Sequence, residues 1–141
     1  AELAGLKAAL AEGRIRKFAI ANPEHAPYGR AARAALHHAG LWEHIEPLLV
    51  LGENASQATQ FAASGGAQGG IIPLSLALAP EVSALGSFAL LPEAMHPPLR
   101  QRMVLLKRAG ETARAFYTFI QTPEARAILK RYGFVLPGEE S

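Results

Sequence analysis

The chain contains no cysteine, so it can form neither disulfides nor thiolate metal sites. Neither sign of charge predominates, because the formal net charge is only +2 and no run of like charges occurs. A nucleic-acid groove needs clustered Lys and Arg, so binding to nucleic acid is not predicted. The apolar stretch 71–78 is interrupted by Pro73 and Ser75 and is shorter than the roughly 18 residues that a membrane span needs. We expect no signal peptide among these residues, and this expectation leaves the cellular compartment open.

Apolar residues, in contrast, are abundant. They make up 50% of the 141 residues, which is enough for a core in a chain of ordinary domain length. Hydrophobic spacing and turn residues predict alternating elements over the first half of the chain. The expected order is a helix ending at Gly13, a strand over 14–21, a helix over 29–39 with one more turn at 41–45, a strand over 48–51, a helix from the Asn54 cap to about Ser64, and a buried strand over 69–74.

This alternation predicts an α/β fold with a parallel central sheet and right-handed crossovers. Beyond residue 78 the pattern changes. We expect strands over 87–91 and 102–107, separated by a proline-rich connector over 92–98.

Two consecutive helices are predicted at the end of the chain. The second has Thr122 as its cap and Pro123 in its first position, and it stops at Gly133. Apolar side chains repeat at helical spacing on both and need a covering surface. We therefore expect self-association or a swapped tail through Phe116, Phe119, Ile120, Ile128, Leu129 and Tyr132.

Two helix starts lie where a parallel α/β sheet binds ligands, beyond the carboxyl ends of its strands. One is at Pro27-Tyr28-Gly29 and the other at Asn54-Ala55-Ser56. Helix starts present backbone N–H groups and a positive dipole end, which suit an anion, and neither first turn contains an acid. Glu24 and Glu53 precede them and are expected to point away. The same pattern is also typical of ordinary α/β turns whose N–H groups bind water.

Other candidate sites are weaker. His37 and His38 are adjacent on a helix and point in different directions, so no metal site built from side chains is predicted. His25 is interpreted as a hydrogen-bonding residue that shapes its loop, and Trp42 as a cover over the core. The glycine pairs at 65–66 and 69–70 lack the Gly-Lys-Ser/Thr of a nucleotide loop. Because no nucleophile is paired with a base, we do not predict an enzyme; an α/β enzyme fragment is the less favoured alternative.

The segment ANPEHAPYGR at 21–30 resembles the (N/D)PEHxPxG loop of periplasmic molybdate-binding proteins. Gly40-Leu-Trp42, Gly52-Glu-Asn54, the helix with Gln57, Gly69-Gly70 and Tyr132-Gly133-Phe134 follow in the family's order. The resemblance covers nearly the whole chain but only the later half or so of a family member.

The resemblance implies a type II periplasmic binding protein. Residues 1–99 would be its second, ligand-binding lobe, and 100–141 the hinge strand and C-terminal helices that return to the first lobe. The ligand would be molybdate or tungstate, held by the backbone amides of Tyr28 and Ala55, with support from Pro27, Gly29, Asn54 and Ser56. Pro73 occupies the position of a tyrosine donor found in some members.

The resemblance further implies no cofactor, a periplasmic location, and the membrane subunits of an ABC importer as partners. The alternative is the ligand-sensing module of a cytoplasmic molybdate-responsive transcription regulator. Because the donors of the first lobe would lie upstream of Ala1, we expect the chain by itself to bind molybdate feebly or not detectably.

Overall fold

The computed structural model describes residues 3–139 of the chain. It divides into two compact units, which meet in the sequence at Leu99 and Arg100. Unit 1 precedes this junction and unit 2 follows it.

A three-stranded parallel sheet forms the centre of unit 1. Its order is β2-β1-β3, with β1 (Phe18–Ala21) between β2 (Leu49–Gly52) and β3 (Gly69–Gly70). Phe18 is in register with Leu49 on one side and with Gly69 on the other. All four residues of β1 are buried, as expected for a strand covered on both faces. The predicted α/β class with parallel pairing is confirmed.

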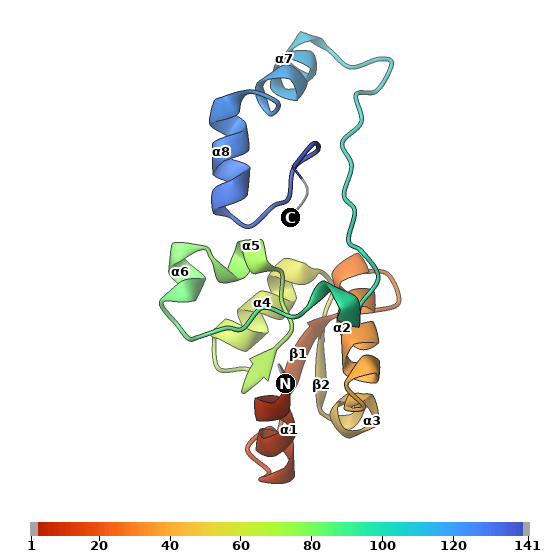
Figure 1. The fold of residues 1–141 in the computed structure, drawn as a ribbon, viewed down its shortest axis with the longest axis vertical. Helices are drawn as coiled ribbons and strands as arrows, with labels where there is room; N and C mark the ends of the chain where they lie inside the picture. Colours follow the sequence, from red (N-terminus) through yellow and green to blue (C-terminus); the bar gives the residue numbers. More distant parts are fainter. Residues whose placement is uncertain (1–2, 140–141) are drawn as a thin grey trace. The chain divides into compact units, whose positions relative to one another are not determined.

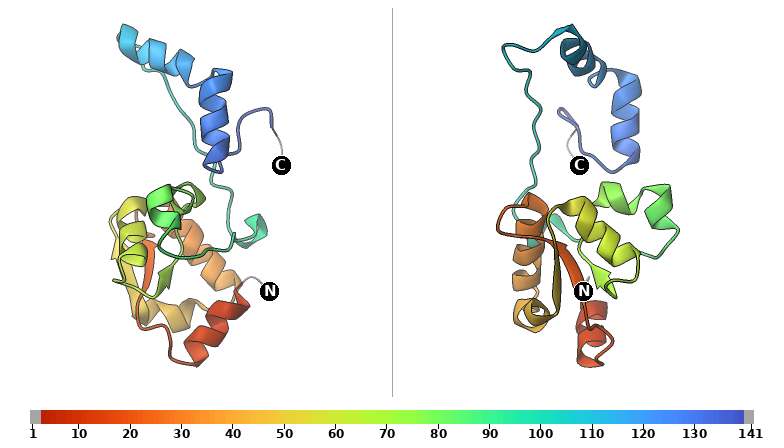
Figure 2. Two further views of the ribbon diagram at one scale, coloured as in Figure 1. Left: turned by 90° about the vertical axis from the view of Figure 1, so that its left-hand side faces the viewer. Right: turned by 180° about the vertical axis from the view of Figure 1, so that it is seen from behind.

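Helices cover both faces of this sheet. The helices α2 (Pro27–His38) and α3 (Trp42–Ile45) lie on one side of β1, and α4 (Ala55–Ala63) lies on the other (Figure 1). Figure 2 shows the same arrangement from behind. The shorter helical segments of unit 1 are α1 (Ala4–Ala11), η1 (Glu46–Leu48), α5 (Leu74–Ala77), α6 (Pro80–Ser83) and η2 (Glu93–Met95).

The two faces carry cores of different size. Phe18 and Ile20 of β1 pack with Leu36 of α2 and Ile45 of α3 in the main cluster. On the other face, Ala21, Ala26 and Ala58 form a small cluster of alanines. Because successive strand residues point to opposite faces, β1 presents its bulky side chains to α2 and its small ones to α4. The small side chains allow α4 to approach the sheet closely.

The strands are shorter than predicted. The expected strand over 14–21 begins only at Phe18, because the amides of Arg16 and Lys17 donate to Gln68 Oε1 instead of to a neighbouring strand. The strand expected over 69–74 is reduced to Gly69–Gly70, followed by one further bond from the Ile71 amide to the Ala19 carbonyl. Pro73 then starts α5 as its N-cap, which takes Leu74 out of the sheet.

Unit 2 contains the two helices expected from the sequence. They are α7 (Glu111–Phe119) and α8 (Pro123–Arg131). The Thr122 side chain accepts a hydrogen bond from the Ala125 amide, and Pro123 occupies the first position, as predicted. Gly133, with a φ of 81°, ends the helix in a left-handed conformation that favours glycine. The start and the end of α8 are therefore both determined by local sequence.

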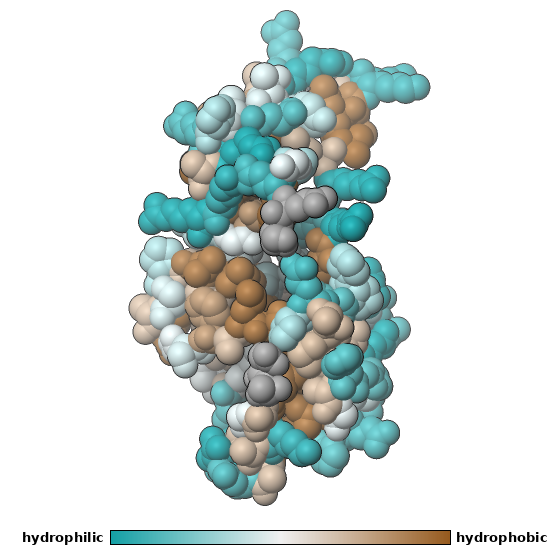
Figure 3. All heavy atoms as spheres, in the orientation of Figure 1, coloured by the Kyte–Doolittle hydropathy of each residue, from teal (hydrophilic) through white to brown (hydrophobic). Residues whose placement is uncertain are grey.

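Among the described residues, no strand forms over 87–91 or 102–107. The prediction of these two strands, including the hinge strand, was therefore wrong. These segments form no regular secondary structure and pair with no strand, and most of their apolar side chains are exposed. Phe88 is 51% exposed, Leu90 65%, Val104 77% and Leu106 71%. Figure 3 shows hydrophobic surface gathered over α5 and α6 of unit 1. A strand requires a neighbouring strand, which composition alone cannot supply.

Candidate functional site: two helix starts at the carboxyl edge of the sheet

The carboxyl ends of β1 and β2 lead directly into α2 and α4. The Asn22 amide donates to the Gly52 carbonyl at 2.7 Å and so extends the pairing of the two strands by one bond. Residues 22–26 then form a closed loop, in which the Ala26 amide donates to the Asn22 carbonyl at 2.9 Å. The Glu24 amide donates to the Asn22 side chain at 3.0 Å. This compact loop fixes the point where α2 begins.

The first turn of α2 is built from Pro27, Tyr28 and Gly29. Pro27 has no N–H, and the first bond of the helix runs from the Arg30 amide to the Ala26 carbonyl at 3.0 Å. The amides of Tyr28 and Gly29 therefore precede the helix's own ladder of hydrogen bonds. The first turn contains no acid, so nothing in it offsets the positive end of the dipole.

Gly29 is required for this close approach. A Cβ at this position would lie 2.1 Å from the carbonyl oxygen of Ala21, at the end of β1. The backbone of α2 thus begins in direct contact with the end of the central strand. Any larger residue would push the helix start away from the sheet.

The start of α4 is held by a reciprocal pair of side chains. Asn54 is the N-cap, and its Oδ1 accepts from the Gln57 amide at 2.9 Å. In return, Gln57 Oε1 accepts from the Glu53 amide at 2.7 Å. The Ala58 amide donates to the Asn54 carbonyl at 3.1 Å, so the amides of Ala55 and Ser56 are the ones that precede the helical ladder. Again the first turn contains no acid.

Gln57 was not among the residues predicted for the site. The signal was nevertheless in the sequence, because an Asn followed three residues later by Gln has the spacing of a capping box. The structure modifies that motif slightly, since the Gln57 side chain binds the amide one residue before the cap.

The two helix starts are joined directly. His25 Nε2 lies 2.9 Å from the carbonyl oxygen of Glu53, the residue before the Asn54 cap. His25 thus makes the loop-shaping hydrogen bond expected of it. The predicted residues Pro27, Tyr28 and Gly29 on one helix, and Asn54, Ala55 and Ser56 on the other, are therefore brought to the same edge of the sheet.

Two acids flank this edge and both are exposed. The Glu24 carboxylate pairs with Arg33 at 3.1 Å, one turn further along α2. The Glu53 carboxylate lies 3.5 Å from His25 Nε2. Each carboxylate therefore has a cationic or polar partner outside the first turns of the helices. This partner limits the repulsion between the carboxylate and an anion placed at the two helix starts.

Trp42 packs against the main core cluster, as predicted, and stacks on His37 with 5.1 Å between ring centroids. Within residues 3–139, no group of three or more His, Asp or Glu side chains is arranged to hold a metal ion. No helix in the same range is long and apolar enough to cross a membrane.

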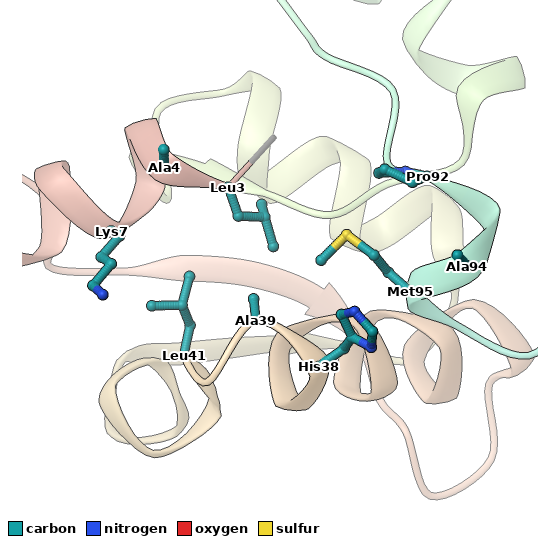
Figure 4. A pocket seen from close by; sticks show the side chains of 9 residues that line it. All are labelled: Leu3, Ala4, Lys7, His38, Ala39, Leu41, Pro92, Ala94 and Met95. Atoms are coloured by element: carbon teal, nitrogen blue, oxygen red, sulfur yellow. The ribbon is translucent and has the colours of Figure 1, made fainter. Parts of the chain in front are cut away.

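A groove of ≈ 420 Å³ lies elsewhere in unit 1, between α1, the end of α2 and η2 (Figure 4). Leu3 and Met95 point toward one another across it, and His38 lies on its margin. His38 ends α2, whereas Tyr28 lies in the first turn of the same helix. At 1.5 Å per residue these positions are about 15 Å apart, so the groove is separate from the helix starts.

The sequence matches the family described as bacterial extracellular solute-binding protein over residues 1–135. It is 39% identical to the molybdate-binding protein ModA of Rhodobacter capsulatus over 131 residues, which are 92% of this chain and 51% of that protein. Identity to ModA of Azotobacter vinelandii is 34%, over 92% of this chain and 52% of the relative.

The solved structure of the periplasmic molybdate-binding protein of Azotobacter vinelandii superimposes with a TM-score of 0.80 at 33% identity. That alignment covers 91% of this chain and 57% of the solved one. The chain therefore spans about half the length of the relatives it matches. From the family match over 1–135, together with the fold, the chain belongs to the bacterial extracellular solute-binding proteins.

Proposed function

We propose that the chain binds a tetrahedral oxyanion, molybdate or tungstate, as the substrate-binding component of an ABC importer. The backbone amides of Tyr28 and Ala55 donate to the ion, and Pro27, Gly29, Asn54 and Ser56 support them. The observation that carries the proposal is the joining of two acid-free helix starts at one edge of the sheet. The ModA names of the relatives give the ligand its identity.

The chemistry of the edge suits a fully deprotonated ion. Molybdate at neutral pH offers only acceptors, and helix starts offer only donors. Phosphate is partly protonated at that pH, and its O–H would meet no acceptor among the amides, which costs binding free energy. Neutral amides also avoid the burial of a formal cation beside the ion. A donor-only site therefore favours molybdate and tungstate over phosphate.

The division of the chain follows from the same proposal. Residues 1–99 would act as the ligand-binding lobe, and 100–141 would return to the other lobe of a two-lobed binding protein. The location would be the periplasm, and the partners would be the importer's membrane subunits. The name of a Bacillus subtilis relative, a putative ABC transporter substrate-binding lipoprotein at 24% identity, is consistent with an importer.

A titration followed by nuclear magnetic resonance tests the proposal directly. The ¹⁵N-labelled chain is titrated with sodium molybdate up to millimolar concentration, with sodium chloride of equal ionic strength as the control. We expect saturable downfield shifts of the Tyr28, Gly29, Ala55 and Ser56 amide protons, because a hydrogen bond to an anion deshields the donor. Shifts confined to residues near Lys and Arg side chains would refute specific binding at the helix starts.

A further inference from the structure

His25 makes a side-chain link between the two helix starts. Its Nε2 lies 2.9 Å from the carbonyl oxygen of Glu53. A carbonyl has no proton to give, so the ring nitrogen must donate. The neutral ring is therefore protonated on Nε2 and not on Nδ1, and the imidazolium would make the same bond.

The link complements a backbone bond on the same pair of loops. The Asn22 amide donates to the Gly52 carbonyl at the beginning of the first loop, and His25 donates to the Glu53 carbonyl near its end. Two successive carbonyls at the end of β2 are thus held by residues of one loop. Because Glu53 directly precedes the Asn54 cap, displacement of its carbonyl would move the start of α4.

We propose that His25 is a positioning residue, which sets the separation and orientation of the α2 and α4 starts for a shared oxyanion. The inference rests on the proposed function. A site built from amides on two different helices binds tightly only if both sets are held near the productive geometry, within about 0.5 Å. The cross-link acts on this distance and does not contact the ion.

The surroundings of His25 favour a geometric role over a purely stabilising one. Its side chain is 51% exposed, and the Glu53 carboxylate, 3.5 Å away, is 78% exposed. Solvent screening leaves such an ion pair with little effect on folding. The hydrogen bond to the carbonyl is the interaction that fixes the second loop, because it joins a side chain to backbone.

The substitutions His25→Gln and His25→Asn both keep an N–H donor but place it at different positions. They therefore test whether the position of the donor matters or only its polarity. Gln can place an amide nitrogen close to the site of Nε2, whereas Asn is one methylene shorter and its amide nitrogen corresponds to Nδ1. We expect His25→Asn and His25→Ala to raise the molybdate dissociation constant of the full chain about three- to tenfold, the effect of one ordinary hydrogen bond. His25→Gln should restore affinity to within about twofold of the wild-type value.

A matched control accounts for loss of stability alone. Ile45 is fully buried in the main core, and Ile45→Val should lower the melting temperature without changing the helix starts. If His25→Asn and Ile45→Val lower the melting temperature by similar amounts, the positioning role predicts that only His25→Asn weakens the binding of molybdate. The positioning role would be overturned if His25→Asn bound molybdate as tightly as wild type. It would also be overturned if His25→Asn and Ile45→Val lost the same amount of molybdate affinity.

A ligand-free measurement tests the hydrogen bond itself. The ¹³C resonance of the Glu53 carbonyl should move in His25→Ala and His25→Asn and return toward the wild-type position in His25→Gln. An unchanged carbonyl resonance in all three variants would overturn the link. If the wild-type chain does not respond to molybdate, the proposed function fails and the positioning role with it. If wild type binds and His25→Asn binds equally well, the positioning role alone fails.

Discussion

The backbone of Gly29 lies against the carbonyl oxygen of Ala21, so closely that a Cβ on Gly29 would be only 2.1 Å from that oxygen. After the loop 22–26, the first turn of helix α2 consequently lies in direct backbone contact with the end of β1. Because the contact joins backbone to backbone, no side-chain rotation can relieve an added methyl group. The position of the candidate donor amides at the start of α2 thus depends on the lack of a side chain at Gly29.

Gly29→Ala should destabilise unit 1 and weaken oxyanion binding together. Displacement of a packed helix start typically costs about 1–3 kcal/mol. Gly5→Ala is the matched control, because the added Cβ meets no atom within 4 Å and lies on α1. That control should stabilise the chain by up to about 1 kcal/mol through helix propensity. Thermal unfolding followed by circular dichroism measures both, and equal melting temperatures would contradict the packing argument.

Asn54 allows capping and electrostatics to be separated. Asn54→Ala removes the acceptor of the Gln57 amide and should cost about 1 kcal/mol of stability. Asn54→Asp keeps an acceptor at the cap and should fold as well as wild type. A charge placed roughly 6 Å from a dianion, in a water-like dielectric, should nevertheless raise the molybdate dissociation constant about tenfold. Denaturant unfolding and the amide titration give the two quantities, and unchanged affinity in Asn54→Asp would count against an anion at this helix start.

These local features show what the sequence could predict. Pro27, the Asn54 cap and the Thr122-Pro123 start were all correctly placed, because helix starts depend on residues within one turn. The parallel pairing of the strands was also predicted correctly, since alternating strands and helices leave few other topologies.

The errors came from elements that depend on distant partners. The segment 102–107 has strand-forming residues, but in the structure Val104 remains 77% exposed and pairs with no strand among the described residues. The third strand stopped at Gly70 because the chain turns into α5 at Pro73. The hydrogen bond between His25 and the Glu53 carbonyl could likewise not be predicted, since a sequence does not specify which carbonyl a loop histidine faces.

Calorimetry should detect only weak binding of molybdate to the chain alone. The two helix starts would surround only one side of the proposed ion and leave the other side hydrated, so fewer hydrogen bonds would offset the loss of hydration. We therefore expect an affinity no tighter than micromolar at low salt. A submicromolar dissociation constant for the monomeric chain would show that α2 and α4 supply a complete site.

Self-association is expected through the helices of unit 2. Phe116 on α7 is 62% exposed and Ile128 on α8 is 53% exposed, which leaves large apolar side chains in water. Sedimentation velocity should show a concentration-dependent increase in mass, and Phe116→Glu with Ile128→Glu should abolish it. A monomer at all concentrations would contradict the prediction.

Acid should loosen the end of the chain. Hydrogen bonds from Lys130 and then Arg126 lower the pKa of the Glu139 carboxyl. Because the folded pKa is depressed, the attachment is present above the ordinary carboxyl range and is lost as pH falls through the lowered value. The protection factor of the Glu139 amide, which donates to the Leu136 carbonyl at 3.0 Å, should fall in acid once the intrinsic exchange rate at each pH is divided out, and should fall at neutral pH in Glu139→Gln. Glu124→Gln on the opposite end of α8 is the control and should leave that protection factor unchanged.

The reciprocal bonds of Asn54 and Gln57 have a consequence for binding. They satisfy the amides on either side of Ala55 and Ser56 from within the chain, whatever occupies the edge of the sheet. The start of α4 is therefore held in helical form by the chain's own side chains and needs no bound ion to form. For the proposed oxyanion site, a helix start that is already formed lowers the ordering cost of binding.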